Sequence, residues 1–121
     1  MKYYEMVQKV QNYSGFTRDE SEDALQVMVE SLSVHLPEPE RKRFASRLPE
    51  YLQSLALSVF ATESNSREDI VKQFMDLQHI DEKRAKKQIK ASCSALKDSI
   101  GGGQLQKIKA QLPPSATSVL K

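Results

Sequence analysis

A leucine–proline pair interrupts the chain twice, late in each half of the sequence. The first is Leu48-Pro49 in "RLPEYLQSL", and the second is Leu112-Pro113 in "QLPPSATSV". Proline disfavours helical geometry in the residue before it and fits the first turn of a helix that follows. Each pair therefore predicts a corner where one short helix ends and another begins, with the leucine as a core anchor.

Apolar residues recur at helical spacing along almost the whole chain, and no stretch alternates as a β-strand does. The stripes run over residues 3–13, 24–36, 51–60, 70–77, 85–100 and 105–112, and the first and fourth of them end at Tyr13 and Leu77. Caps and breaks separate the stripes: Gly15, Thr17, "PEP" at 37–39, Asp81 and "GGG" at 101–103. The pattern predicts an all-α protein in which long helices alternate with short ones.

"TRDE" at residues 17–20 has the form of a capping box. In this motif the Thr17 side chain accepts from the backbone N–H of Glu20, and the Glu20 carboxylate bonds back to Thr17. Glu22 and Asp23 crowd the same helix start, where acids suit the positive end of the helix dipole. We interpret these acids as capping residues.

The two halves align without a gap when Leu48-Pro49 is placed opposite Leu112-Pro113. Five of the 57 aligned positions are identical, so the similarity lies in the order of stripes, caps and breaks. We interpret it as an internal duplication, with repeats at residues 1–60 and 65–121 and a linker at 61–66. A unit of about 57 residues is marginal alone. We therefore expect two units of about four helices each, two long and two short, packed as one helical domain over residues 1–121.

The second repeat carries a resemblance to a known family. Its segments "SREDIVKQF" and "AKKQIKASCSALKDSIGGGQLQKIKAQLP" combine a Ser-Arg-Glu start, a long helix, a Gly-containing turn and a Gln-Leu-Pro. Together with the duplicated unit, they resemble the bacterial domain-of-unknown-function family twenty-two sixty-seven. The resemblance covers nearly the whole chain and implies an all-helical bundle of bacterial source. It implies no activity and no catalytic residues.

Reactive side chains are few and isolated. His35 and His79 lie in different halves without metal-ligand spacing, and Cys93 falls on an apolar stripe, as a core thiol does. The "GGG" lacks the Lys-Ser/Thr of a phosphate-binding loop and predicts a turn. We therefore expect no catalytic, metal-binding or cofactor-binding residues, and we expect the protein not to be an enzyme.

One stretch, "KRAKKQIK", concentrates positive charge on a helix face turned away from the apolar stripe. Its five cations are Lys83, Arg84, Lys86, Lys87 and Lys90. Such a face is either a solvated surface or a contact for an anion, such as a nucleic-acid backbone or an acidic patch of another protein. No aromatic residue interleaves the lysines, so stacking on single strands is unsupported.

Composition and charge argue against a membrane-spanning or a secreted protein. The chain is 39% hydrophobic and carries a net charge of +2, split as −2 in residues 1–57 and +4 in residues 58–121. No apolar run approaches the ~20 residues of a membrane span, and the lone cysteine and lack of a secretory signal favour a cytoplasmic protein. We expect a non-enzymatic, protein-binding module. The alternatives are a nucleic-acid-binding protein acting through Lys83–Lys90 and a small-ligand pocket between the repeats; self-association stays open.

Overall fold

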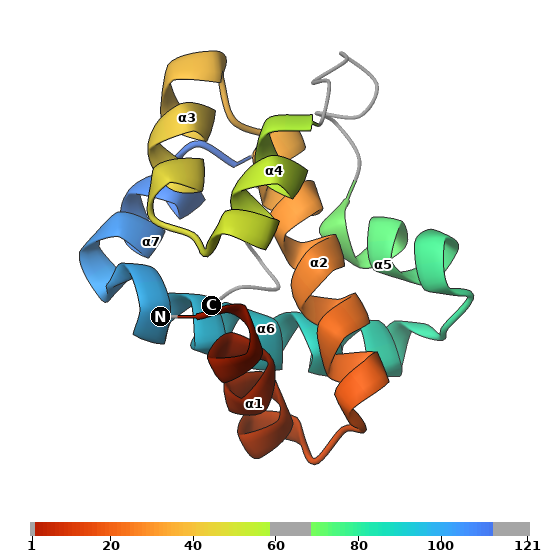
Figure 1. Ribbon diagram of the computed structural model, residues 1–121. Helices are drawn as coiled ribbons and strands as arrows, with labels where there is room; N and C mark the ends of the chain where they lie inside the picture. Colours follow the sequence, from red (N-terminus) through yellow and green to blue (C-terminus); the bar gives the residue numbers. More distant parts are fainter. Residues whose placement is uncertain (1, 59–68, 113–121) are drawn as a thin grey trace.

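The computed structural model describes residues 2–58 and 69–112, which form seven α-helices and no β-strand (Figure 1). The predicted all-helical fold is confirmed. The predicted linker and Pro113 lie outside the described residues. The helices are α1 (Tyr3–Ser14), α2 (Arg18–Val34), α3 (Glu38–Ser46), α4 (Glu50–Ser58), α5 (Ile70–Gln78), α6 (Glu82–Ile100) and α7 (Gly102–Ala110).

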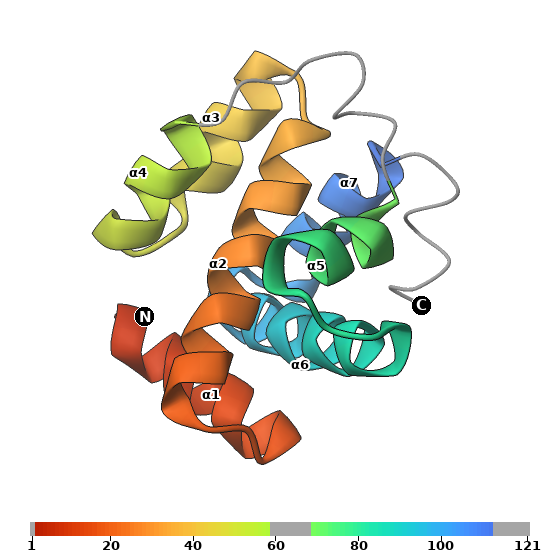
Figure 2. The same ribbon diagram turned by 90° about the vertical axis from the view of Figure 1, so that its right-hand side faces the viewer.

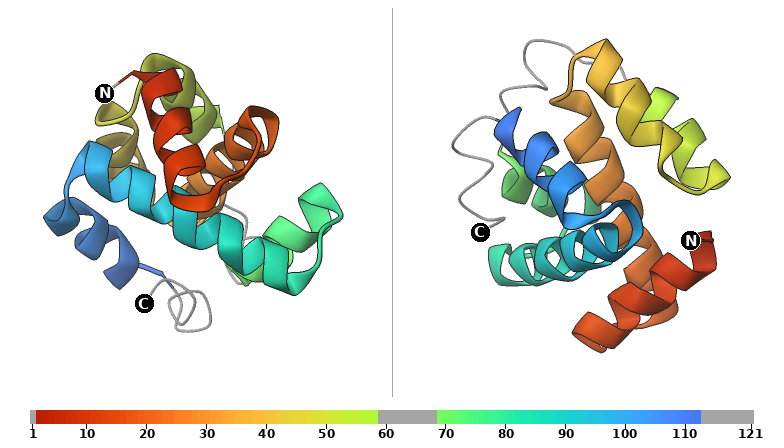
Figure 3. Two further views of the ribbon diagram at one scale, coloured as in Figure 1. Left: turned by 90° about the horizontal axis from the view of Figure 1, so that it is seen from below. Right: turned by 90° about the vertical axis from the view of Figure 1, so that its left-hand side faces the viewer.

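The two long helices, α2 and α6, pack against each other at the centre of the bundle (Figure 1). Helix α1 contacts both of them and crosses α6 when the molecule is seen from below (Figure 3). Helix α5 also contacts both, and Figure 2 shows it against α6 beside α2. Helices α3 and α4 pack as a pair, α4 also contacts α2, and α7 packs on α6. One cluster of buried apolar side chains runs from Met6 to Leu112 and joins both halves of the chain.

The helix ends follow from the capping residues. Thr17 Oγ1 accepts from the N–H of Glu20 at 3.2 Å, and Asp81 Oδ1 accepts from the N–H of Arg84 at 2.8 Å. These side chains satisfy backbone donors that the first turn of a helix leaves free. Gly15 ends α1 with φ of 78°, a left-handed conformation that suits glycine. The predicted starts of the two long helices and the predicted end of α1 are confirmed.

The helix bounds of the two halves correspond in the alignment that places Leu48 opposite Leu112. Helices α2 and α6 begin at aligned positions, and α3 and α7 both begin and end at aligned positions. The left-handed residues Gly15 and His79 are also aligned, and the corner leucines Leu48 and Leu112 are both buried. These bounds agree with an internal duplication, which stays a prediction.

Three residues of the predicted apolar stripes lie on the surface: Tyr51, which is 55% exposed, Tyr13 and Leu77. Tyr13 is 53% exposed and Leu77 is 60% exposed. Both lie in the last turn of their helices, α1 and α5, and the Tyr13 hydroxyl donates to Asp98 Oδ2 of α6 at 2.6 Å. Helical spacing identifies which face of a helix packs inward. It does not show how far along that face the neighbouring helix extends.

Candidate binding site

The predicted basic face lies on the solvent side of α6. Its exposed lysines are Lys83, Lys86, Lys87 and Lys90. Within the described part of the chain, one of these lysines is ion-paired: Lys86 Nζ lies 3.8 Å from the Glu82 carboxylate. The other three therefore present positive charge that no acid of that part of the chain pairs with.

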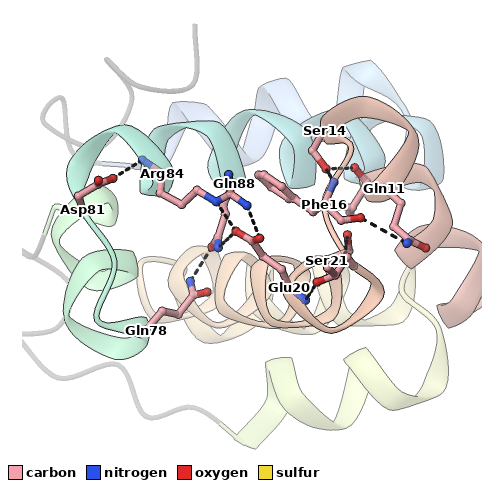
Figure 4. A network of polar contacts seen from close by, with 11 residues as sticks. Gln11, Ser14, Phe16, Glu20, Ser21, Gln78, Asp81, Arg84 and Gln88 are labelled. Atoms are coloured by element: carbon pink, nitrogen blue, oxygen red, sulfur yellow. Dashed lines mark hydrogen bonds and ion pairs between the residues drawn. The ribbon is translucent and has the colours of Figure 1, made fainter.

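Arg84, the fifth cation of the predicted face, points across to α2 (Figure 4). Its Nε donates to Glu20 Oε2 at 2.6 Å, and its Nη2 donates to Glu20 Oε1. Gln88 Nε2 also donates to Glu20, at 2.9 Å. The hydrogen bonds from Arg84 are the main reason that the pKa of the Glu20 carboxyl lies below its usual value. Arg84 thus links the two halves of the molecule.

This contact also changes the predicted capping box. The Thr17 half is present, but the Glu20 carboxylate bonds to Arg84 and Gln88. A bidentate, charge-assisted pair is stronger than one bond to a neutral backbone amide. The tertiary contact therefore replaces the local one.

The fold brings aromatic rings beside lysines that have none near them in sequence. Lys87 Nζ lies 5.4 Å from the centroid of the Phe16 ring. Tyr13, Lys87 and Lys90 line a shallow cleft of about 240 Å³ between α1 and α6. An aromatic side chain of α1 therefore borders the basic face, although none interleaves the lysines in the sequence.

A groove of about 570 Å³ lies between α2 on one side and α5, the α5–α6 turn and α6 on the other. We call it the α2–α5 groove. Asp23, Val27 and Glu30 follow one another at spacings of four and three residues, so they share the α2 wall. Leu77 and Ile80 contribute apolar surface to the opposite wall. The remaining lining residues are polar, and Figure 4 labels all of them except Gln26; they are Glu20, Gln26, Gln78, Arg84 and Gln88.

Of the two acids Asp23 and Glu30 in the α2–α5 groove, Glu30 is half-buried and Asp23 is exposed. Burial is the largest cause that raises the pKa of Asp23 and the one cause that raises the pKa of Glu30. Neighbouring carboxylates, of which Asp19 has the largest effect, raise the pKa of Asp23 further. No cation among residues 2–58 and 69–112 forms an ion pair with Asp23 or Glu30. The groove therefore suits a ligand that carries positive charge next to apolar groups.

The sequence analysis did not predict the α2–α5 groove, either from the spacing of the acids or from that of the lysines. The acids at the start of α2 had a sufficient local explanation as helix caps, and Glu30 lies beyond the first turns. The signal available in the sequence was the shared helix face of Asp23, Val27 and Glu30. Its opposite wall comes from α5, in the other half of the chain, which no local pattern predicts.

The cysteine and the two histidines considered in the sequence analysis lie at separate places in the fold. Cys93 is buried, as predicted, and burial raises the pKa of its thiol, which favours the unreactive form. His79 is exposed at the end of α5, whereas His35 is buried at the end of α2.

Across the described residues, no group of three or more His, Cys, Asp or Glu side chains is placed to hold a metal ion. None of the described helices combines the length and the apolar character that crossing a membrane requires.

Comparison with known families decides where the chain belongs. The model of a family of uncharacterized conserved proteins, DUF2267, matches residues 3–119. The chain belongs to the DUF2267 family. The DUF2267 match spans both halves and therefore includes the basic face and the α2–α5 groove. No curated protein shows significant similarity to the chain.

Proposed function

We propose that this DUF2267 protein is a non-enzymatic protein-binding module and that it holds a cationic amphipathic helix in the α2–α5 groove. The observation that carries the proposal is the placement of Asp23 and Glu30, two carboxylates without an ion pair in the described chain, beside Val27 and Leu77. Amphipathic helices dock by placing apolar anchors in a groove of this kind. Lysine or arginine side chains flanking the anchors would pair with the two acids.

Both walls of the groove contribute to the expected affinity. Covering Leu77 removes exposed apolar surface from water, which is worth about 25 cal/mol per Å². A cation beside Asp23 or Glu30 favours the charged carboxylate that burial disfavours. The same negative charge repels a nucleic-acid backbone, so the groove selects between these two classes of partner.

The test uses a designed helical peptide of leucine and lysine, with its leucines on one face, and fluorescence anisotropy. A leucine–glutamate peptide of the same spacing is the control ligand. We expect the lysine peptide to bind and the glutamate peptide not to bind. The double change Asp23→Lys with Glu30→Lys is expected to weaken binding by at least about tenfold. Leu77→Ser removes an apolar anchor contact and is expected to weaken binding by a smaller factor.

Asp76→Lys is the matched surface control, because Asp76 is exposed on α5 beside Leu77 and does not line the groove. Thermal unfolding establishes that each variant folds. Equal weakening by Asp76→Lys and by the changes at Asp23 and Glu30 would indicate unspecific charge attraction and reject the proposal. Failure of the lysine peptide to bind at low salt would also reject it.

The basic face of α6 supports a second candidate function, binding to a nucleic-acid backbone. Lys83, Lys87 and Lys90 are exposed and form no ion pair within the described chain, and Tyr13 lies beside two of them. We expect binding to duplex DNA or RNA that falls steeply with salt. It should be lost when Lys83, Lys86 and Lys87 become Glu. No binding at low salt would exclude this function.

We also infer that the module works in the bacterial cytoplasm. The bacterial source rests on the family resemblance described above. The reducing compartment rests on Cys93, which is buried and has no second cysteine to pair with. Fractionation of the native host that recovered the protein outside the cytoplasm would contradict this inference.

A further inference from the structure

The short helices α3 and α7 lie on the side of the molecule away from α5 (Figures 1 and 3). A pocket lies between these two helices. We call it the α3–α7 pocket. Its volume is about 250 Å³, and Leu36, Phe44 and Ile108 line its apolar floor. Arg43, Arg47 and Lys107 are among the residues at its rim. We propose that it binds a single-chain fatty carboxylate, with the alkyl chain on the floor and the carboxylate among the three cations.

Residues from both halves of the chain form the floor of the pocket. Phe44 of α3 and Ile108 of α7 occupy aligned positions of the two halves, and Leu36 follows the end of α2. These three apolar side chains are 1–8% exposed, so packing in the core holds the floor in place. A pocket of this size is slightly below the roughly 300–1,000 Å³ typical of drug-sized ligands. The size favours one alkyl chain of medium length over a two-chain lipid.

The rim carries excess positive charge. Its one carboxylate, Glu40, lies 3.7 Å from Arg43 Nη1, which leaves Arg47 and Lys107 without an ion pair inside the described ranges. One of these two cations comes from each half. A guanidinium binds a carboxylate through two parallel hydrogen bonds. Positive charge beside an apolar floor therefore favours an anionic amphiphile and disfavours a cationic one.

The test uses decanoate below its critical micelle concentration. Isothermal titration calorimetry and thermal unfolding measure its binding to the protein. We expect saturable binding of one decanoate per chain and a midpoint of unfolding that rises with decanoate concentration. Decyltrimethylammonium has the same chain with a cationic headgroup. It is expected not to bind the variant with Asp23→Lys and Glu30→Lys, in which the acids of the α2–α5 groove are replaced. Butyrate shares the carboxylate but has too short a chain to cover the floor, and it is also expected not to bind.

The double change Arg47→Glu with Lys107→Glu is expected to weaken decanoate binding by at least about tenfold. The matched control is Lys42→Glu with Lys72→Glu, which reverses two exposed charges on α3 and α5 outside the pocket. This control is expected to bind decanoate as the parent does. If charge reversal unfolds the chain, the neutral change Arg47→Gln with Lys107→Gln gives the same readout.

Three results would overturn the proposal. One is equal weakening by the rim variant and its control, which would indicate long-range attraction. Another is binding of decyltrimethylammonium as strong as that of decanoate in the variant with Asp23→Lys and Glu30→Lys, which would indicate unspecific partitioning. The third is absence of saturable decanoate binding. The variant with Asp23→Lys and Glu30→Lys is expected to bind decanoate as the parent does. The proposal for the α2–α5 groove and the proposal for the α3–α7 pocket can therefore be rejected independently.

Discussion

His35 is a buried residue whose polar atoms have no partner within the described chain. It lies directly after α2, it is 8% exposed, and neither Nδ1 nor Nε2 forms a hydrogen bond there. Burial lowers the pKa of His35 below its ordinary value of 6.5, because a charged imidazole would lose its hydration there. The folded protein therefore keeps this ring neutral at a pH where the unfolded chain binds a proton.

The first prediction is a loss of stability in mild acid that depends on His35. A lowered pKa in the folded state leaves stability intact above about pH 6.5 and reduces it as the pH falls below that value. From about pH 7.5 to about pH 5.5, the free energy of unfolding should fall more in the parent than in His35→Leu. At the upper pH His35→Leu should be as stable as the parent or more stable by up to about 1–3 kcal/mol, because it removes buried polar atoms without a partner in the described chain.

Urea unfolding at a series of pH values measures this difference. His79→Asn is the control, because His79 is exposed and asparagine tolerates its left-handed conformation, with φ of 54°. The control should keep the pH dependence of the parent. A His35→Leu variant whose stability follows that of the parent at every pH would show that His35 is not the responsible group.

At the level of the helix, the three glycines at 101–103 have two different roles: one ends α6 and two begin α7. Gly101 has φ of 92° and ψ of 147° and ends α6, whereas Gly102 and Gly103 belong to the first turn of α7. The sequence pattern predicted a turn for all three. Apart from neighbouring atoms of its own chain segment, a Cβ atom at Gly101 or at Gly103 would meet nothing within 4 Å in the described chain. The two positions therefore differ in backbone conformation and not in available space.

The second prediction uses this difference. Gly101→Ala should destabilise the protein by about 1–3 kcal/mol, because its conformation is almost restricted to glycine. Gly103→Ala should stabilise it by about 0.4–1 kcal/mol, because alanine loses less conformational freedom on folding. Each variant is the control of the other in urea unfolding. Destabilisation of similar size at both positions would mean that space, not backbone conformation, limits the triplet.

The helices that could be predicted were those with local signals. Thr17 and Asp81 cap the long helices through their own first turns, and Gly15 ends α1 through its own φ, so a few neighbouring residues suffice. The exposure of Tyr13 and Leu77 depends on where a distant helix ends, which the stripes did not show. Secondary structure is thus readable where its cause lies within one or two turns of the chain.

Across the whole molecule, the two halves carry opposite charges at aligned positions. The acidic positions on α2 and their basic counterparts on α6 are Asp19 with Lys83, Glu20 with Arg84, Glu22 with Lys86 and Asp23 with Lys87. One aligned pair, Glu20 and Arg84, forms the ion pair between the halves. The sequence indicated the basic face because Lys83, Lys86, Lys87 and Lys90 lie within two turns of one helix. It did not reveal the partner of Arg84 or the α2–α5 groove, because both require residues from the other half.

The third prediction is that neither half is stable alone. The core cluster is continuous across both halves, and α1 rests on α6, where Lys9 Nζ lies 3.7 Å from the Asp98 carboxylate. A unit of about 60 residues is only marginally stable even with a complete core, and each half here would lose the core contacts that the other half provides. Separate peptides of residues 1–64 and 65–121 should therefore show no cooperative thermal transition by circular dichroism.

Mixing the two peptides in equal amounts is the informative control, because the mixture lacks only the covalent link. We expect the mixture to regain helical signal and a cooperative transition whose midpoint rises with peptide concentration, as for an association reaction. Replacing the buried Val10 by Asp in the first peptide should abolish this recovery, since an unpaired charge would enter the shared core. If either peptide alone unfolded cooperatively at the midpoint of the full chain, the halves would be independent domains. The α2–α5 groove and the α3–α7 pocket would then depend on how two separately stable units dock, because each has walls from both halves.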